Sequence, residues 1–224
     1  MNETLNNKFV NWATYLLLGI SLVSVCVTKY IPSLDGPQHL HTINVLAELI
    51  KGNDFMETYY KVNPTIVGYW SSHFILVLFR LIFPAWMAEK AYVIIYIIGM
   101  LVSFRFLVSQ VSQKKTSVAT LLIFPFMFST YQLLGYYTFS FAAIFYFSGL
   151  GLLFKLIKES KIKYLFLFLV LSLGVFLSHA LVFVFYLMSV AVVYVGTLIA
   201  NNLDFKKWII GGVKIVLAIV PSLI

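Results

Sequence analysis

The residues best suited to chemistry lie close together, in the stretch 33–41. Asp35 offers a carboxylate, and His39 and His41 offer imidazoles, which move protons or bind metals near neutral pH. The Asp-Gly-Pro order that begins at Asp35 is typical of a helix start, with an acidic cap followed by proline in the first turn. We therefore expect an amphipathic helix over about 37–51, with Asp35 either in a catalytic site or serving only as its cap.

A metal ion bound by this stretch is a further hypothesis. Asp35 and His39 are spaced so that they can converge, whereas His39 and His41 do not face each other on a helix. The sequence therefore allows a divalent metal ion on Asp35 and His39, and it predicts no other cofactor. Interfacial histidines that bind no metal are the alternative.

Four more side chains are candidates for substrate binding at the same face. Arg80 interrupts an apolar run, so its guanidinium must reach water, a lipid phosphate or a carboxylate. Tyr136 and Tyr137 lie in a short turn between apolar stretches, and His179 follows Ser178 in another. Each has a purely structural alternative: Arg80 extends to the interface, the tyrosines form an aromatic belt, and His179 bonds Ser178 or the backbone.

Composition places these residues in a membrane protein. The chain of 224 residues is 61% hydrophobic and 11% charged, too few polar residues to cover a soluble domain of this size. Cys26 is the only cysteine, so a disulfide within the chain is excluded. The sequence lacks a P-loop, a Rossmann glycine pattern, a Cys-x2-Cys pair and an HExxH motif, and no basic and aromatic pattern predicts a nucleic-acid partner.

Charge-free runs predict an all-α, polytopic bundle of transmembrane helices that forms a single domain over 1–224. A helix needs about 20 residues to cross about 30 Å of hydrocarbon. The predicted crossings are about 9–29, 90–110, 116–131, 138–155, 163–178, 180–200 and 208–224. Residues 30–89 form one external loop with amphipathic surface helices at about 37–51 and 65–83. Because the last apolar run has no polar flank, we expect further spans beyond residue 224.

The basic turns predict the orientation. Lysines cluster at 114–115, 155–163 and 206–207, and two crossings separate each neighbouring pair of clusters, so all three share one side. The positive-inside rule makes that side cytoplasmic, together with the N-terminus. If 65–83 crossed the membrane, the N-terminus would instead be outside. The balance of acidic and basic residues between 29 and 90 favours the first topology.

Asp35-Gly-Pro-Gln-His39, with Asn63-Pro64 and Tyr69-Trp70 further on, follows a first span and opens a long external loop. This layout resembles the GT-C superfamily of membrane glycosyltransferases, which use polyprenyl-phosphate sugars and include protein O-mannosyltransferases and aminoarabinose transferases. The local sequence is similar to that of uncharacterised bacterial multi-pass proteins of this kind. The resemblance implies Asp35 as the catalytic carboxylate, which takes a proton from the acceptor hydroxyl or orients it, with a cation such as Arg80 on the leaving phosphate.

The same resemblance implies a multi-pass protein of the bacterial inner (plasma) membrane with a cytoplasmic N-terminus. Its partners would be a lipid-linked sugar donor and membrane lipids. Two departures from the family pattern leave alternatives open: 131–138 holds no second acid, and His179 stands where many members carry a basic residue. A transporter or flippase of a lipid-linked saccharide and a non-catalytic assembly subunit are the alternatives. The scarcity of polar residues in the predicted spans favours a surface site over a transport path.

Overall fold

The computed structural model describes residues 3–63, 65, 68–201 and 205–222. Throughout this part of the chain the structure contains helices and no strand, which confirms the predicted all-α class. The elements in chain order are α1 (Glu3–Val27), α2 (Gly36–Ile50), α3 (Asp54–Tyr59), α4 (Trp70–Ile82), α5 (Ala85–Ser112), η1 (Val118–Ile123), α6 (Phe124–Met127), α7 (Thr130–Leu133), α8 (Tyr137–Glu159), α9 (Ile162–Ser178), α10 (Ala180–Asn201), α11 (Phe205–Ile219) and η2 (Val220–Ser222).

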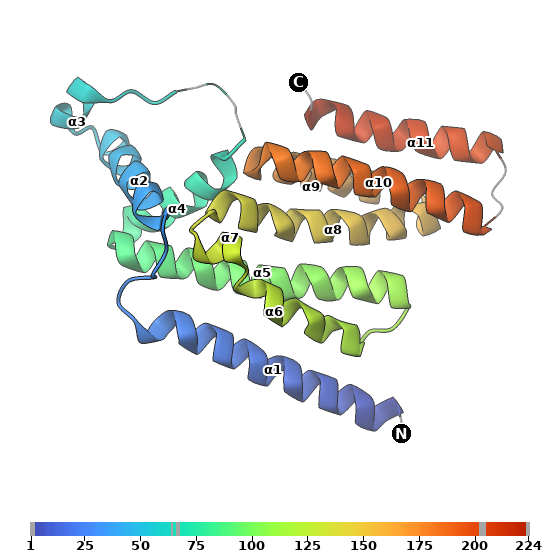
Figure 1. The fold of residues 1–224 in the computed structure, drawn as a ribbon. Coiled ribbons are helices and arrows are strands. Elements are labelled where there is room, and N and C mark those ends of the chain that lie inside the picture. Colours follow the sequence, from blue (N-terminus) through green and yellow to red (C-terminus); the bar gives the residue numbers. More distant parts are fainter. Residues whose placement is uncertain (1–2, 64, 66–67, 202–204, 223–224) are drawn as a thin grey trace.

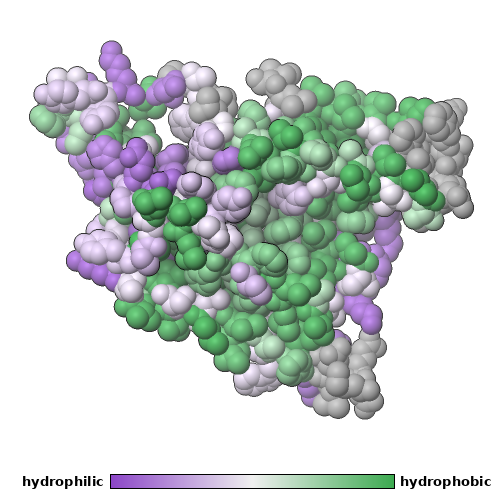
Figure 2. Space-filling view, in the orientation of Figure 1, coloured by the Kyte–Doolittle hydropathy of each residue, from purple (hydrophilic) through white to green (hydrophobic). Residues whose placement is uncertain are grey.

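Four of the described helices are long and apolar enough to cross a membrane. They are Asn7–Val27 within α1, all of α5, all of α8 and Ala180–Thr197 within α10, with lengths of 18 to 28 residues. Large apolar side chains of these helices point outward, and hydrophobic surface covers most of the bundle in Figure 2. Exposed apolar surface of this extent is stable against lipid rather than water. The chain is therefore a membrane protein with transmembrane helices.

The helices of the bundle lie side by side, and the surface helices gather at one end of it (Figure 1). The chain runs from the N-terminus through α1 to the end that carries α2, α3 and α4, and α5 leads back. The turns that follow α5 and α8, which hold Lys114 and Lys161, lie at the end where the N-terminus lies (Figure 1). The turns before α8 and α10 lie at the opposite end, beside α2 and α4. Which end faces the cytoplasm remains a prediction.

The segment predicted as one crossing over 116–131 is not a continuous helix. It consists of η1, α6 and α7, none longer than six residues, and it runs along the bundle from one end to the other (Figure 1). Pro125 lies in the first turn of α6, where its missing backbone N–H is tolerated. The helical backbone ends at Phe128, and α7 begins only at Thr130.

The other predicted helices differ from the observed ones by a few residues at their ends, and one short helix was not predicted. The surface helix predicted over 65–83 begins only at Trp70, and residues 66 and 67 of that prediction lie outside the described part, as does Pro64. The short α3 was not predicted. At the other end, the crossing predicted over 208–224 corresponds to α11 and η2, and residues 223 and 224 of it lie outside the described part.

An apolar core fixes the surface helices to the bundle. Ile43 of α2 and Leu76 of α4 are fully buried, and they belong to one cluster with Tyr92 of α5 and with Tyr137 and Phe141 of α8. Both short helices are amphipathic, so each buries an apolar face and leaves its polar face outside. The hydrophilic surface in Figure 2 accordingly concentrates at the end where α2 and α3 lie. This packing places the chemistry-bearing stretch at the rim of the bundle.

Candidate functional site

Asp35 lies at the corner where the chain enters α2. Its backbone N–H donates a hydrogen bond of 2.9 Å to the carbonyl oxygen of Leu134, in the turn before α8. Asp35 occupies the N-cap position, but its side chain makes no capping hydrogen bond. The side chain is partly exposed, and among the described residues its carboxylate has no hydrogen-bond or ion-pair partner. Helix capping therefore does not account for this carboxylate, which stays available to a ligand.

Two glycines allow the corner to pack closely. Gly135 has a φ of +85°, a conformation that favours glycine, and a Cβ there would lie 2.6 Å from the backbone nitrogen of Gly36. A Cβ on Gly36 would in turn meet Ser33 Oγ, and would lie 2.8 Å from Glu89 Oε1 and 3.0 Å from the Tyr137 hydroxyl. The backbone at Asp35 is thus enclosed between the turn before α8 and a polar group behind it.

That polar group is built around Glu89, which was not predicted as a site residue. The Glu89 side chain is buried, with 2% of its surface exposed, and its Oε1 accepts a hydrogen bond of 2.6 Å from the Tyr137 hydroxyl. The backbone of Ile31 also bonds this carboxylate. The Tyr137 hydroxyl lies 3.2 Å from Ser33 Oγ. An ionisable residue near the start of a transmembrane helix was the signal available from sequence, because such residues mark functional positions by default.

Tyr92 of α5 connects this polar group to Ser72 of α4. Its hydroxyl lies 2.9 Å from Ser72 Oγ and 3.0 Å from the carbonyl oxygen of Tyr137, and the side chain is fully buried. Buried polar groups that are hydrogen-bonded to one another fix the packing of the helices that carry them. The helices α4, α5 and α8 are therefore joined directly behind Asp35.

His39 and His73 form a pair in front of Tyr137. His39 Nδ1 lies 3.2 Å from His73 Nε2, and His73 Nδ1 lies 3.1 Å from the carbonyl oxygen of Tyr69. The His39 ring stacks on the Tyr137 ring at 5.4 Å between centroids, with 25° between the planes. The structure thus brings His39 of α2 together with His73 of α4, which was not predicted as a site residue.

The surroundings of the pair favour neutral rings. Burial lowers the pKa of His39, and the neighbouring His73 lowers it further, while the Asp35 carboxylate and the Gly135 backbone act in the opposite direction. Burial also lowers the pKa of His73, against the effect of the Tyr69 carbonyl. Two neutral imidazoles that lie close to a free carboxylate can accept and pass on a proton.

Arg80 does not face the corner at Asp35. Its Nε donates a hydrogen bond of 2.5 Å to Asn44 Oδ1, and its Nη2 lies 3.9 Å from Glu48 Oε1. Glu48 also forms an ion pair of 3.0 Å with Lys51. Arg80 therefore joins α4 to α2. Of the partners predicted for it, which were water, a lipid phosphate and a carboxylate, the structure provides the carboxylate of Glu48.

The remaining candidates surround the corner without joining the histidine pair. His41 is exposed on α2, and Tyr136 is partly exposed with its ring 6.2 Å from that of Tyr131. His179 meets the rings of Tyr69 at 5.1 Å and Phe139 at 5.2 Å, and burial lowers its pKa. Of the predicted substrate-binding residues, His39 interacts electrostatically with Asp35, and Tyr137 stacks on His39.

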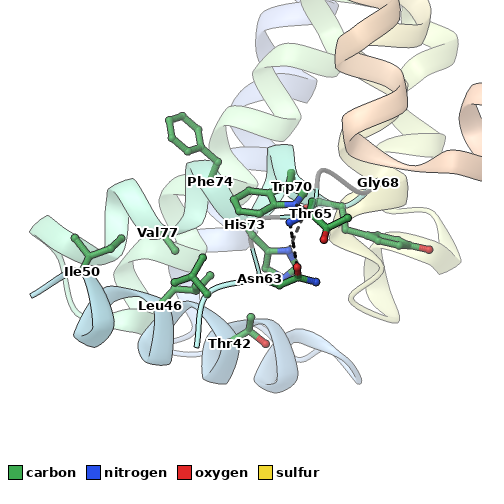
Figure 3. Close-up of a pocket in the computed structure, with 12 residues that line it drawn as sticks. Thr42, Leu46, Ile50, Asn63, Thr65, Gly68, Trp70, His73, Phe74 and Val77 are labelled. Carbon is green, nitrogen blue, oxygen red and sulfur yellow. Dashed lines mark hydrogen bonds between the residues drawn. The ribbon is translucent and has the colours of Figure 1, made fainter. Parts of the chain in front are cut away.

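An apolar groove lies beside the histidine pair, between α2, α4 and the loop before α4 (Figure 3). Its volume is about 420 Å³, within the usual range of small-molecule sites. In Figure 3, Leu46, Ile50 and Val77 lie toward one end, while His73 and Asn63 lie toward the other. Its lining also includes Thr42, Val62, Thr65, Gly68, Tyr69, Trp70 and Phe74. The groove surface is almost wholly apolar, although His73 and Asn63 lie toward one end, so it fits the hydrocarbon part of a ligand.

The structure provides no support for the metal hypothesis. Among the described residues, no group of three or more His, Cys, Asp or Glu side chains could hold an ion, and His39 uses Nδ1 for His73. Comparison with known proteins gives no matching family model, no similar curated protein and no similar solved structure.

Proposed function

We propose that this chain is a membrane glycosyltransferase, which moves a sugar from a polyprenyl-phosphate donor to an acceptor hydroxyl at the bundle end that carries α2 and α4. The observation that carries the proposal is the state of Asp35. Its backbone is held by Leu134, but its carboxylate is partly exposed and unused as a helix cap. A fixed backbone with a free carboxylate is what a residue that binds and orients a hydroxyl requires.

In the proposed reaction the acceptor oxygen forms a bond to the anomeric carbon of the donor sugar. The bond from that carbon to the phosphate oxygen breaks, and the polyprenyl phosphate leaves with the electron pair. The acceptor hydroxyl passes its proton to a basic side chain at the site as the new bond forms. Asp35 accepts the hydrogen bond of that hydroxyl, and its negative charge stabilises the positive charge that develops on the sugar.

The apolar groove supports a lipid-linked donor. His73 lines the groove and lies 3.2 Å from His39, which follows Asp35 in the first turn of α2, so the groove and the carboxylate belong to one region. Burial of a hydrocarbon chain contributes about 0.8 kcal/mol per methylene. In this proposal the groove holds the part of the polyprenyl chain next to the phosphate, while the rest stays in the membrane. Arg80 is hydrogen-bonded to Asn44 and lies 3.9 Å from Glu48, so it is not the group that we propose to bind the phosphate.

The proposed setting is the bacterial inner membrane, with the N-terminus in the cytoplasm and Asp35 at the outer face. The location of Lys114 and Lys161 at the N-terminal end of the bundle supports this orientation, because cytoplasmic loops carry an excess of lysine and arginine. The lipid-linked sugar donor and the surrounding membrane lipids are then the partners of the chain.

The proposal is tested by Asp35→Asn in membranes that contain the protein, with transfer measured from a panel of radiolabelled polyprenyl-phosphate hexoses. Asparagine keeps the size of the side chain and removes the charge, so we expect transfer to fall at least about a hundredfold. The matched control is Asp54→Asn, which removes an exposed carboxylate from the first turn of α3 and should leave transfer unchanged. Transfer at the wild-type rate by Asp35→Asn would remove the proposed role.

A further inference from the structure

His39 and His73 lie in a row of hydrogen-bonding groups that ends at a backbone carbonyl. Tyr69 O lies 3.1 Å from His73 Nδ1, and His73 Nε2 lies 3.2 Å from His39 Nδ1. A hydrogen bond to the backbone of Gly135 also raises the pKa of His39, and so favours the protonated ring. Since a carbonyl oxygen only accepts, the identity of each donor in this row can be worked out from the Tyr69 end.

The protons on the two neutral rings have one consistent arrangement. The Tyr69 carbonyl requires the proton of His73 to be on Nδ1, which leaves His73 Nε2 as an acceptor. His39 must then donate from Nδ1 to His73 Nε2. A neutral imidazole carries one proton, so the lone pair of His39 is on Nε2. The pair therefore has a single vacant proton position, and it belongs to His39.

Tyr69, whose carbonyl ends the row, has an unusual backbone conformation. Tyr69 has a φ of 91°, in the left-handed region that non-glycine residues rarely adopt. Neighbouring contacts hold this conformation. The Tyr69 ring meets His179 edge-on at 5.1 Å, and Ser71 Oγ lies 2.6 Å from Ser178 Oγ. Such conformations persist where the surrounding structure enforces them, and they cluster at functional sites. The enforced direction of the Tyr69 carbonyl sets the tautomer of His73.

We propose that His39 Nε2 accepts the proton of the acceptor hydroxyl, and that His73 is a positioning residue that fixes the tautomer of His39. This inference rests on the proposed glycosyl transfer. The acceptor oxygen bonds to the anomeric carbon, its proton moves to His39 Nε2, and the polyprenyl phosphate leaves with the electron pair of the broken bond. Asp35 orients the hydroxyl and balances the charge of the imidazolium that forms.

The groups around His39 are suited to this role. The Asp35 carboxylate and the Gly135 backbone both favour a protonated His39, while burial and His73 keep the ring neutral until a proton arrives. The Tyr137 ring stacks on one face of His39, and Glu89 lies behind it, bonded to the Tyr137 hydroxyl. The imidazolium would thus form against an aromatic ring and within the electrostatic influence of the Asp35 carboxylate, and both stabilise a cation.

The tautomers are measured on the whole chain in detergent micelles, with ¹⁵N-labelled histidine and long-range ¹H–¹⁵N spectra, at a pH above the titration of both rings. His39→Gln assigns the signal of His39. We expect the wild type to carry its proton on Nδ1 of His39. His73→Gln offers a side-chain oxygen in place of the Nε2 acceptor and should keep this tautomer, whereas His73→Phe removes the acceptor and should lose it. A wild-type His39 with its proton on Nε2 overturns the proposal, even if a variant fails to fold.

Transfer kinetics test the second half of the proposal. His39→Gln should lower kcat by about a hundredfold, a typical contribution of a positioned proton acceptor. His73→Phe should lower kcat and change its pH profile with little effect on KM, and His73→Gln should restore most of the rate. Asp54→Asn, at an exposed residue of α3 outside the site, is the control and should leave kcat unchanged. A wild-type kcat in His39→Gln overturns the role of His39 while glycosyl transfer stands. If no donor is turned over by the wild type, the proposed function fails and the tautomer result is judged by its own spectra.

Discussion

The Tyr137 hydroxyl donates a hydrogen bond of 2.6 Å to the buried carboxylate of Glu89. The two residues lie on different transmembrane helices, α8 and α5. Tyr137 also stacks on His39, and its hydroxyl lies 3.2 Å from Ser33 Oγ, so the pair reaches both sides of Asp35. The buried Glu89 carboxylate therefore helps to hold the residues on either side of the partly exposed Asp35.

Removing this hydroxyl should destabilise the protein. Tyr137→Phe leaves the buried Glu89 carboxylate without its side-chain donor, and we expect a loss of about 1–3 kcal/mol in the free energy of unfolding. Thermal unfolding in detergent measures the change. Tyr131→Phe, at a tyrosine with 49% of its surface exposed, is the control and should have little effect. If Tyr137→Phe unfolds at the wild-type temperature, the bond to Glu89 does not support the corner.

Gly135→Ala should disturb the backbone around Asp35 more than Gly52→Ala disturbs its own surroundings. Gly135 and Gly52 both have positive φ, at +85° and +73°, so alanine costs about 1 kcal/mol of backbone strain at either position. Only at Gly135 would the new Cβ lie 2.6 Å from the backbone of Gly36, whereas nothing lies within 4 Å at Gly52. We therefore expect Gly135→Ala to lower both the unfolding temperature and transfer activity, and Gly52→Ala to lower only the first, slightly. Equal effects of the two variants would contradict the close packing at Asp35.

Stability should depend on pH through the partly buried histidines His39 and His73. Their pKa values in the folded chain are below the ordinary value of 6.5, so the unfolded chain binds more protons as the pH falls. Their contribution is therefore complete above about pH 6.5 and is lost as the pH falls through the lowered pKa values of the folded state. His179 acts in the same direction. Unfolding temperatures measured in detergent should decrease over this window, and less steeply in a His39→Gln, His73→Gln double variant. An unchanged slope in that variant would assign the effect to other groups.

The orientation is tested by cysteine labelling with a membrane-impermeant maleimide. Cys26 is exposed, so Cys26→Ser supplies the background. His41→Cys on α2 and Lys115→Cys after α5 occupy exposed positions at opposite ends of the bundle. We expect the first to be labelled from outside intact cells and the second only after the membrane is opened. Labelling of Lys115→Cys but not His41→Cys in intact cells would put Asp35 in the cytoplasm, and glycosyl transfer at the outer face would be excluded.

The sequence by itself determined the class of the protein and the position of its surface helix. Hydropathy and charge spacing are local properties of the chain, and they predicted the all-α class and the helix that begins after Asp35. The Asp-Gly-Pro order was sufficient to place Asp35 at the N-cap. Local pattern was not sufficient over 116–131, where apolar composition predicted one helix and the chain forms η1, α6 and α7 instead.

Only the tertiary structure decided which side chains meet. Glu89 lies far from Asp35 in the sequence, and its role depends on how α5 and α8 are rotated against each other. The contact between His39 and His73 spans 34 positions and depends on the packing of α2 against α4. Arg80 could have faced lipid, water or a carboxylate, and the same packing gave it Asn44 and Glu48. Hydrophobic pattern fixes which face of a helix is buried, but hydrogen bonds between helices require a rotation and a register that only the packed core sets.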